Sequence, residues 1–312
     1  MPASTRKIAK EGTILTSTLT SGLLKPEQAQ KFLQQTFEST TLGSHVRHVM
    51  KRAKVGEIDK IGIAKRILRE KIENTDDGYR AKPITSQIGY STKAVRLPWE
   101  ITEETLRENI EGQNLEKIIT DLMTRQLGLD AMDLCINADE ATPSENPDYD
   151  FLKLDDGWIK QIKTGGHTLD AANAALSLDL FYRMLHAVPG KYITNSTKWI
   201  MSPHTQQNWE RILYNYNIKH GSTAPESMYK APAGVSILTE SLFPDGKIVL
   251  ADPKNLGIVN TYDMRIRKTT EGKEAIMQDK RFYVIHFDFD SFIEEIDATG
   301  IIENINDTVE VA

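Results

Sequence analysis

Three residues near the C-terminal end of the sequence have side chains that could act together chemically. His286, Asp288 and Asp290 alternate with phenylalanines in the segment HFDFD, so they share one face of a predicted strand. An imidazole and two carboxylates on one face could hold a metal ion. The solvated face of a half-buried strand explains the pattern more simply, and we favour it. The acids could instead contact a basic hairpin of a neighbouring subunit.

Other reactive side chains lack the neighbours that catalysis requires. Cys135 lies among apolar residues of a predicted helix with no histidine near it in sequence, which indicates a small core residue. Gly165-Gly166-His167 matches neither phosphate-binding loop, and Ser202-Pro203-His204 lacks the glycines of a nucleophile elbow. HExxH and paired CxxC motifs are missing. We therefore expect no enzyme, and we assign no catalytic, cofactor-binding or metal-binding residue.

Positive charge is concentrated in a segment of the N-terminal third. The cations are Lys51, Arg52, Lys54, Lys60, Lys65, Arg66, Arg69 and Lys71. They could contact nucleic-acid phosphates, but the interleaved aromatics of a single-strand binding platform are missing. We favour an arm that docks on an acidic subunit surface. The formal net charge of −6 argues against nucleic-acid binding by the whole surface, though not by a local basic face.

The basic segment belongs to a predicted two-stranded excursion over residues 46–99. KIGIAKRIL and PITSQIGYSTKAVRLPWE read as strands, with a turn at Asp77-Gly78 between them. Neither strand can bury itself on its own chain, and an isolated ribbon is marginal in water, so we expect this hairpin to lie on a neighbouring subunit. Pro98 is expected to end the second strand, and Thr102 to cap a short helix.

A long helix over residues 113–138 is expected to form the spine of the chain. Asn114 is its predicted N-cap, and its apolar stripe is Ile118, Leu122, Leu129, Met132 and Ile136, widened by Leu115, Ile119 and Met123. At about 1.5 Å per residue the helix would be roughly 39 Å long. The preceding residues 1–20 read as a flexible arm, and residues 21–40 as a helix with Pro26 in its first turn.

The remainder predicts an α+β body. Helices are expected at LSLDLFYRMLHAV and, over about ten residues, at HTQQNWERIL. Two long β runs follow, and the second, RFYVIHFDFDSFIEEI, places Tyr283, Ile285, Phe287 and Phe289 on one face. With 39% hydrophobic and 26% charged residues the chain is typical of a soluble folded protein. No apolar run approaches the ~20 residues of a membrane span, and the single cysteine favours a reducing compartment.

This order of elements resembles that of the major capsid proteins of tailed bacteriophages, which have the Hong Kong 97-type shell fold. The resemblance lies in KAVRLPWEITEETLRENIEGQNLEKIITDLMTRQLGLDAMDLCINAD, and in DGKIVLADPKNLGIVNTYDMRIRKT followed by RFYVIHFDFDSFIEEI. It covers the chain from about residue 46 onward. Ala251-Asp252-Pro253 stands where many members have a Gly-Asp-aromatic triplet.

The resemblance implies a division of the chain into four parts. Residues 1–45 would form an N-terminal arm, and residues 46–100 an extended hairpin loop over the adjacent subunit. Residues 101–165 and 259–312 would form a peripheral domain around the spine helix at 113–138. Residues 166–258 would form an axial domain that meets its copies at five-fold and six-fold positions.

The resemblance also implies a structural function. The chain would self-assemble through pentamers and hexamers into the icosahedral shell of a virion, in the host cytoplasm, around double-stranded DNA that it contacts non-specifically. A portal and a separate scaffolding protein would be partners, because about forty-five residues before the hairpin are too few for a built-in scaffold. No cross-linking residues are assigned, so Lys65 and Lys71 remain lysines on an exposed arm. The alternatives are an encapsulin-type nanocompartment shell and a soluble α+β enzyme.

Overall fold

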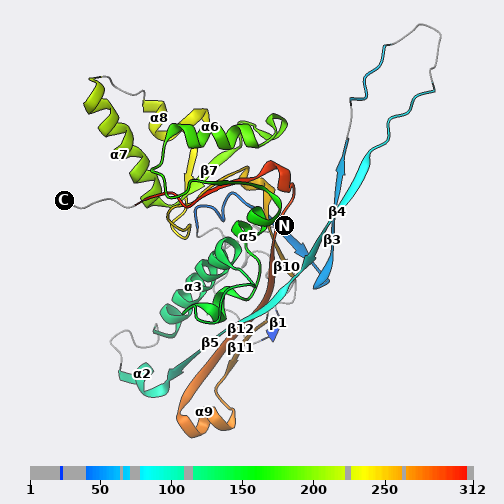
Figure 1. Cartoon of the computed structure of the whole chain (residues 1–312). Coiled ribbons are helices and arrows are strands. Elements are labelled where there is room, and N and C mark those ends of the chain that lie inside the picture. The colour runs from blue at the N-terminus through cyan, green and yellow to red at the C-terminus, as the bar shows by residue number, and fades with distance from the viewer. Residues whose placement is uncertain are drawn as a thin grey trace, which may run out of the picture.

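A computed structural model describes residues 22–23, 40–63, 66–70, 78–108, 115–221, 226–261 and 265–307. The fold is mixed α+β, with a long hairpin that projects from a body built on two sheets (Figure 1). The predicted N-terminal arm and its helix fall largely outside the described residues, as does the predicted cap Asn114. Among the described residues, no helix combines the length and hydrophobicity that a membrane crossing requires.

The first sheet is organised around one long strand, β12. Within the described residues it contains β1 (Gly22–Leu23), β2 (Arg47–Lys51), β5 (Lys93–Thr102), β10 (Leu256–Thr261), β11 (Arg265–Thr269) and β12 (Lys280–Ile293). β12 pairs antiparallel with β5, β10 and β11, and β2 pairs parallel with β10. A short helix, α9 (Lys273–Gln278), connects β11 to β12. Residues that alternate along β12 therefore face either the core or the opposite side of the sheet.

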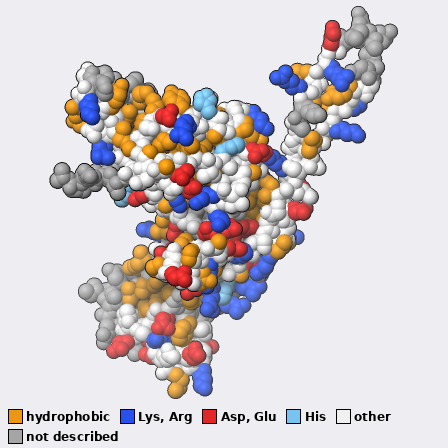
Figure 2. Space-filling view, viewed as in Figure 1, with side chains coloured by type: hydrophobic (Ala, Val, Ile, Leu, Met, Phe, Trp, Pro, Cys, Tyr) orange, Lys and Arg blue, Asp and Glu red, His pale blue; other side chains and the backbone are white. Residues whose placement is uncertain are grey.

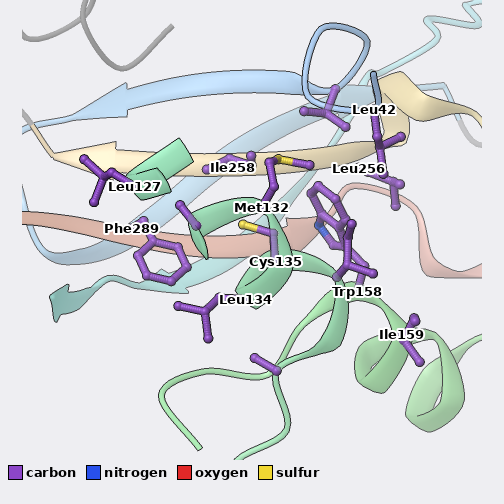
Figure 3. Close-up of a cluster of buried hydrophobic side chains, with 14 of the residues drawn as sticks. Leu42, Leu127, Met132, Leu134, Cys135, Trp158, Ile159, Leu256, Ile258 and Phe289 are labelled. Atoms are coloured by element: carbon purple, nitrogen blue, oxygen red, sulfur yellow. The ribbon is translucent and has the colours of Figure 1, made fainter. Parts of the chain in front are cut away.

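The predicted spine helix is confirmed as α3 (Leu115–Asn137), which packs on this sheet. Met132 and Cys135 point into a cluster with Phe289 of β12 and Trp158 of the neighbouring helix (Figure 3). The predicted stripe is wrong at Ile118 and Leu122, which are 40% and 57% exposed, whereas the residues predicted to widen it, Leu115, Ile119 and Met123, do pack. The face that packs there includes Leu115, Ile119, Met123 and Leu127, spaced by four residues.

Two local predictions for the entry to this helix had different outcomes. Thr102 caps α2 (Glu103–Glu108) as expected, because its Oγ1 accepts a hydrogen bond of 3.2 Å from the Thr105 N–H. The prediction that Pro98 ends the strand is wrong, since β5 continues to Thr102 with Pro98 opposite Val284. Among the described strands β5 pairs with β12 alone, so a proline without an N–H is tolerated on its free edge.

The second sheet carries the rest of the body. Its described strands, in spatial order, are β6 (His167–Asp170), β13 (Gly300–Glu303), β9 (Ile248–Ala251), β7 (Lys198–Met201) and β8 (Ile237–Thr239). The remaining described helices are α4 (Tyr149–Leu152), α5 (Trp158–Gly165), α6 (Leu178–Ala187), α7 (Pro203–His220) and α8 (Glu226–Lys230), with single turns η3 (Gly190–Tyr192), η4 (Pro232–Gly234), η5 (Pro253–Asn255) and η6 (Ile296–Ala298). The α7 helix is longer than the ten residues predicted, because Ser202 caps its start and Gly221, with φ of 60°, ends it.

The strand pairing refines the predicted division of the chain. β2 and β5 lie within the predicted hairpin range 46–100, yet both pair within the first sheet. β13 lies within the predicted peripheral range 259–312, yet it pairs with β9 of the second sheet. The division into peripheral and axial domains itself stays a prediction.

Candidate assembly surfaces

The projecting hairpin is built from β3 (Val55–Gly62) and β4 (Ile84–Ser91). The strands pair antiparallel along their whole length, from Val55 opposite Ser91 to Gly62 opposite Ile84. The predicted first strand at KIGIAKRIL ends early, since residues 66–70 have no regular structure. Apolar side chains beyond the base face solvent, with Ile61 74% exposed and Leu68 95% exposed. A two-stranded ribbon with exposed apolar side chains needs a partner surface.

The base of the hairpin is fixed firmly to the body. Tyr90 and Ile58 pack with Phe292 and Val259 in a small separate core. The Tyr90 hydroxyl donates a hydrogen bond of 3.2 Å to the Ala53 carbonyl. Figure 1 shows the remainder of the hairpin extending away from the body, so its direction is set at this base.

The acids of HFDFD take part in the same attachment. Asp288 is 5% exposed, forms an ion pair of 3.0 Å with Lys54 and accepts a hydrogen bond of 3.1 Å from the Thr261 hydroxyl. Asp290 accepts a hydrogen bond of 2.6 Å from the Ser91 N–H. The solvated-face interpretation is therefore wrong for Asp288, and both acids contact the base of this chain's own hairpin. Within the described ranges, no three histidine, cysteine or carboxylate side chains are grouped to hold a metal ion.

A buried carboxyl pair lies beside this attachment and escaped the sequence analysis. Asp155, which precedes α5, lines a hollow together with Asp290, Ser91 and Lys93. Asp155 is 5% exposed, and its Oδ2 atom has no hydrogen-bond partner among the described residues. Burial, reinforced by the nearby charge of Asp290, raises the pKa of Asp155 to about 7. Burial also raises the pKa of Asp290.

The residues considered as nucleophiles occupy structural positions. Cys135 is fully buried in the core, and burial raises the pKa of its thiol well above the usual value. Ser202 donates to one oxygen of Asp245, while His204 Nδ1 lies 3.1 Å from the other. The carboxylate thus stands between hydroxyl and imidazole, which is not the arrangement of a nucleophile and its base. Gly165 ends α5, Gly166 is its C-cap, and His167 begins β6, so this segment is a structural connection.

Comparison with known proteins finds a similar sequence and similar structures. No family model matches the chain. The curated protein "Putative prophage capsid protein YqbE" of Bacillus subtilis (strain 168) is 27% identical over 320 residues, which cover 97% of this chain and 99% of the relative. A chain of the solved structure "Satellite phage P4 procapsid including size determination (Sid) protein" superposes with a TM-score of 0.66 at 14% identity, over 93% of this chain and 94% of that one.

The chain has the Hong Kong 97-type shell fold. The predicted fold class is thereby confirmed, including the extended hairpin and the spine helix. The SrpI encapsulin of Synechococcus elongatus PCC 7942 superposes as well, with a TM-score of 0.54 at 13% identity over 94% of each chain. Phage shells and encapsulin shells thus share this fold.

Proposed function

We propose that this chain is the major capsid protein of a tailed bacteriophage or prophage, and that it assembles into the icosahedral shell around double-stranded DNA. The observation that carries the proposal is the hairpin, which is anchored rigidly at its base while Ile61, Leu68 and Ile84 remain exposed. In a closed shell each hairpin lies on a neighbouring copy, so the exposed apolar area is buried in every subunit at once.

The comparisons favour this function over the alternatives. The relative that matches over nearly the full length of both chains bears the name of a prophage capsid protein. An encapsulin-type shell with an enzyme cargo shares the fold but is not better supported. An enzyme with Ser202 as its nucleophile would need a base beside that hydroxyl, and in the described part of the chain Asp245 lies between Ser202 and His204.

Partners and location follow from the same proposal. Pentamers and hexamers of this chain would make the shell, with a portal at one vertex and a separate scaffolding protein during assembly in the host cytoplasm. Residues 166–258 would surround the capsomer axis, and the sheet around α3 would form the peripheral part. The finished protein would reside in the virion.

A deletion at the hairpin tip tests the proposal. Removal of residues 70–82 should leave a folded subunit, because the small core at Tyr90 and Phe292 is untouched. The yield of closed shells, measured by sedimentation, should fall by more than about tenfold, because the hairpin contact is repeated in every subunit. A matched control replaces the exposed Asp148 by asparagine, far from the hairpin in sequence, and should assemble like the wild type. Equally abundant and equally stable shells from the deletion variant would refute the proposed role of the hairpin.

A further inference from the structure

A hollow at the base of the hairpin carries more negative charge than the described chain neutralises. Five carboxyl side chains and one lysine line it: Glu57, Glu140, Asp155, Asp156, Asp290 and Lys93. The lysine is already engaged, because Lys93 forms an ion pair of 2.7 Å with Glu140. The other four carboxyls form no ion pair with the described residues. We call this site the acidic hollow, and its charge favours a cation.

Asp155 is the buried residue of the acidic hollow that lacks a partner. It is 5% exposed, and its Oδ2 atom has no hydrogen-bond partner among the described residues. Asp290, which lines the same hollow, accepts a hydrogen bond from the Ser91 N–H, a neutral donor. A buried carboxylate oxygen without a donor costs free energy, and two neighbouring carboxylates without a cation add to this cost. A positively charged donor in the hollow would remove both costs.

The outer hairpin carries a cation that is too far from the acidic hollow of its own copy. The strand β3 begins at Val55 beside the hollow and ends at Gly62, so at about 3.3 Å per residue it is roughly 23 Å long. Figure 2 shows Lys and Arg side chains on the outer part of the hairpin, away from the body. Arg66 follows the end of β3, is exposed, and forms no ion pair or hydrogen bond with the described residues. Its guanidinium group can therefore reach an acidic hollow only on a second copy.

We propose that the acidic hollow of one copy binds the guanidinium group of Arg66 from the hairpin of a second copy. The proposal rests on the proposed function and names the residues that hold the hairpin in place. A guanidinium group donates to two carboxylates at once, stays charged and is more weakly hydrated than an ammonium group, which favours Arg66 over Lys82 of the same hairpin. Arg69 is already engaged, since it lies over the Tyr79 ring, 3.8 Å from its centroid.

Apolar side chains beside both groups agree with this contact. Leu68, two residues after Arg66, is 95% exposed, and Val55 on the rim of the acidic hollow is 68% exposed. A hairpin that places Arg66 in the hollow brings apolar surface from both copies together, and its burial adds to the ion pairs.

Self-association of the full-length chain, measured by analytical ultracentrifugation, tests the inference. Glu57 is the acid to exchange, because it is exposed and its side chain has no partner among the described residues. Arg66→Glu and Glu57→Arg each set like charges against each other, so each should weaken association by about tenfold. The combined variant Arg66→Glu/Glu57→Arg restores opposite charges and should associate within about threefold of the wild type. Lys82→Glu is the matched control on the same hairpin and should stay within about twofold.

The pH dependence of self-association tests the role of the buried carboxyl. A guanidinium group beside Asp155 lowers the pKa of that carboxyl, so association releases up to one proton and becomes tighter as the pH rises. The association constant of the wild type should increase about fivefold between pH 6 and pH 7, and Asp155→Asn should lose most of this increase. The other charged groups that line the hollow are Glu57 on β3, Lys93 on β5, Asp290 on β12, and Glu140 and Asp156 between α3 and α5.

Several outcomes would overturn the inference, and they differ from those that would overturn the capsid function. The docking of Arg66 is wrong if Arg66→Glu associates like the wild type, if Lys82→Glu weakens association instead, if the combined variant is no better than either single one, or if the wild type does not self-associate. Closed wild-type shells beside any of these results would leave the capsid function standing. A chain that forms no shell, with or without a scaffolding protein, would overturn the capsid function, whatever the two hairpin variants do.

Discussion

Replacing Asp155 by asparagine should remove most of the pH dependence of subunit stability between pH 5 and pH 8. The pKa of Asp155 is about 7 in the folded protein, against an ordinary value of 3.8. A raised carboxyl pKa means that the folded state holds the proton more tightly. Its stabilising effect is therefore complete below pH 3.8 and is lost as the pH rises to 7.

The magnitude follows from the same difference. One pKa unit corresponds to about 1.4 kcal/mol, so the complete loss is about 4 kcal/mol, of which about 3 kcal/mol falls between pH 5 and pH 8. With an unfolding entropy of about 2.1 cal/mol/K per residue, this corresponds to a decrease in Tm of roughly 4–5 °C for a chain of this length. Asp155→Asn cannot ionise, so it should melt higher than the wild type at pH 8.

The assay is thermal unfolding of the unassembled subunit, followed by circular dichroism at the two pH values. Asp148→Asn is the matched control, because Asp148 is exposed and its side chain accepts no cap hydrogen bond. It should show the wild-type pH dependence. The charged residues that line the hollow with Asp155 are Glu57 on β3, Lys93 on β5, Glu140 after α3, Asp156 before α5 and Asp290 on β12. If Asp155→Asn keeps the full pH dependence, the carboxyl pair is not its source.

Two further predictions concern the attachment of the hairpin and of the spine helix. A Cβ atom at Gly257 would lie 2.2 Å from the Phe292 ring, so Gly257→Ala should destabilise the protein by about 1–3 kcal/mol in denaturant unfolding. The control is Gly89→Ala, which has open space around the added methyl group and should change stability by less than about 1 kcal/mol. Equal effects of the two alanines would contradict the packing described at Phe292. Arg281 forms ion pairs with both Glu103 of α2 and Glu116 of α3, so Arg281→Gln should lower the free energy of unfolding by about 2–3 kcal/mol in the same assay. The control Lys280→Gln breaks the pair with the exposed Glu100 and should lower it by less than about 1 kcal/mol. An Arg281 variant as stable as the wild type would show that this network does not anchor the helix.

The sequence predicted where the helices and strands lie better than it predicted which surfaces they pack against. The spine helix was readable from its apolar spacing, because a helix of this length needs a continuous buried face. The face that packs at its start was misassigned, since Ile118 and Leu115 both fit a wide apolar stripe and only the position of the sheet distinguishes them. Pro98 appeared to end a strand because the sequence does not show that β5 has a free edge.

The features of the candidate site depend on contacts between distant segments. The burial of Asp288 requires Lys54 and Thr261, which approach it from separate strands and loops. The carboxyl pair of Asp155 and Asp290 joins a loop to a strand that follows much later in the chain. His286 lies between Arg265 and Arg96 only because of the register of three strands. Residue types and spacing within one segment contain none of this information.

Electron microscopy of the protein expressed alone and with its scaffolding protein tests the central claim most directly, with sedimentation of the same samples. The proposed capsid function predicts closed shells or uniform rings of five or six subunits, and particles from phage-producing cells that contain double-stranded DNA. A subunit that stays monomeric under both conditions would contradict it, and closed shells that hold an enzyme in place of DNA would assign the chain to the nanocompartments instead.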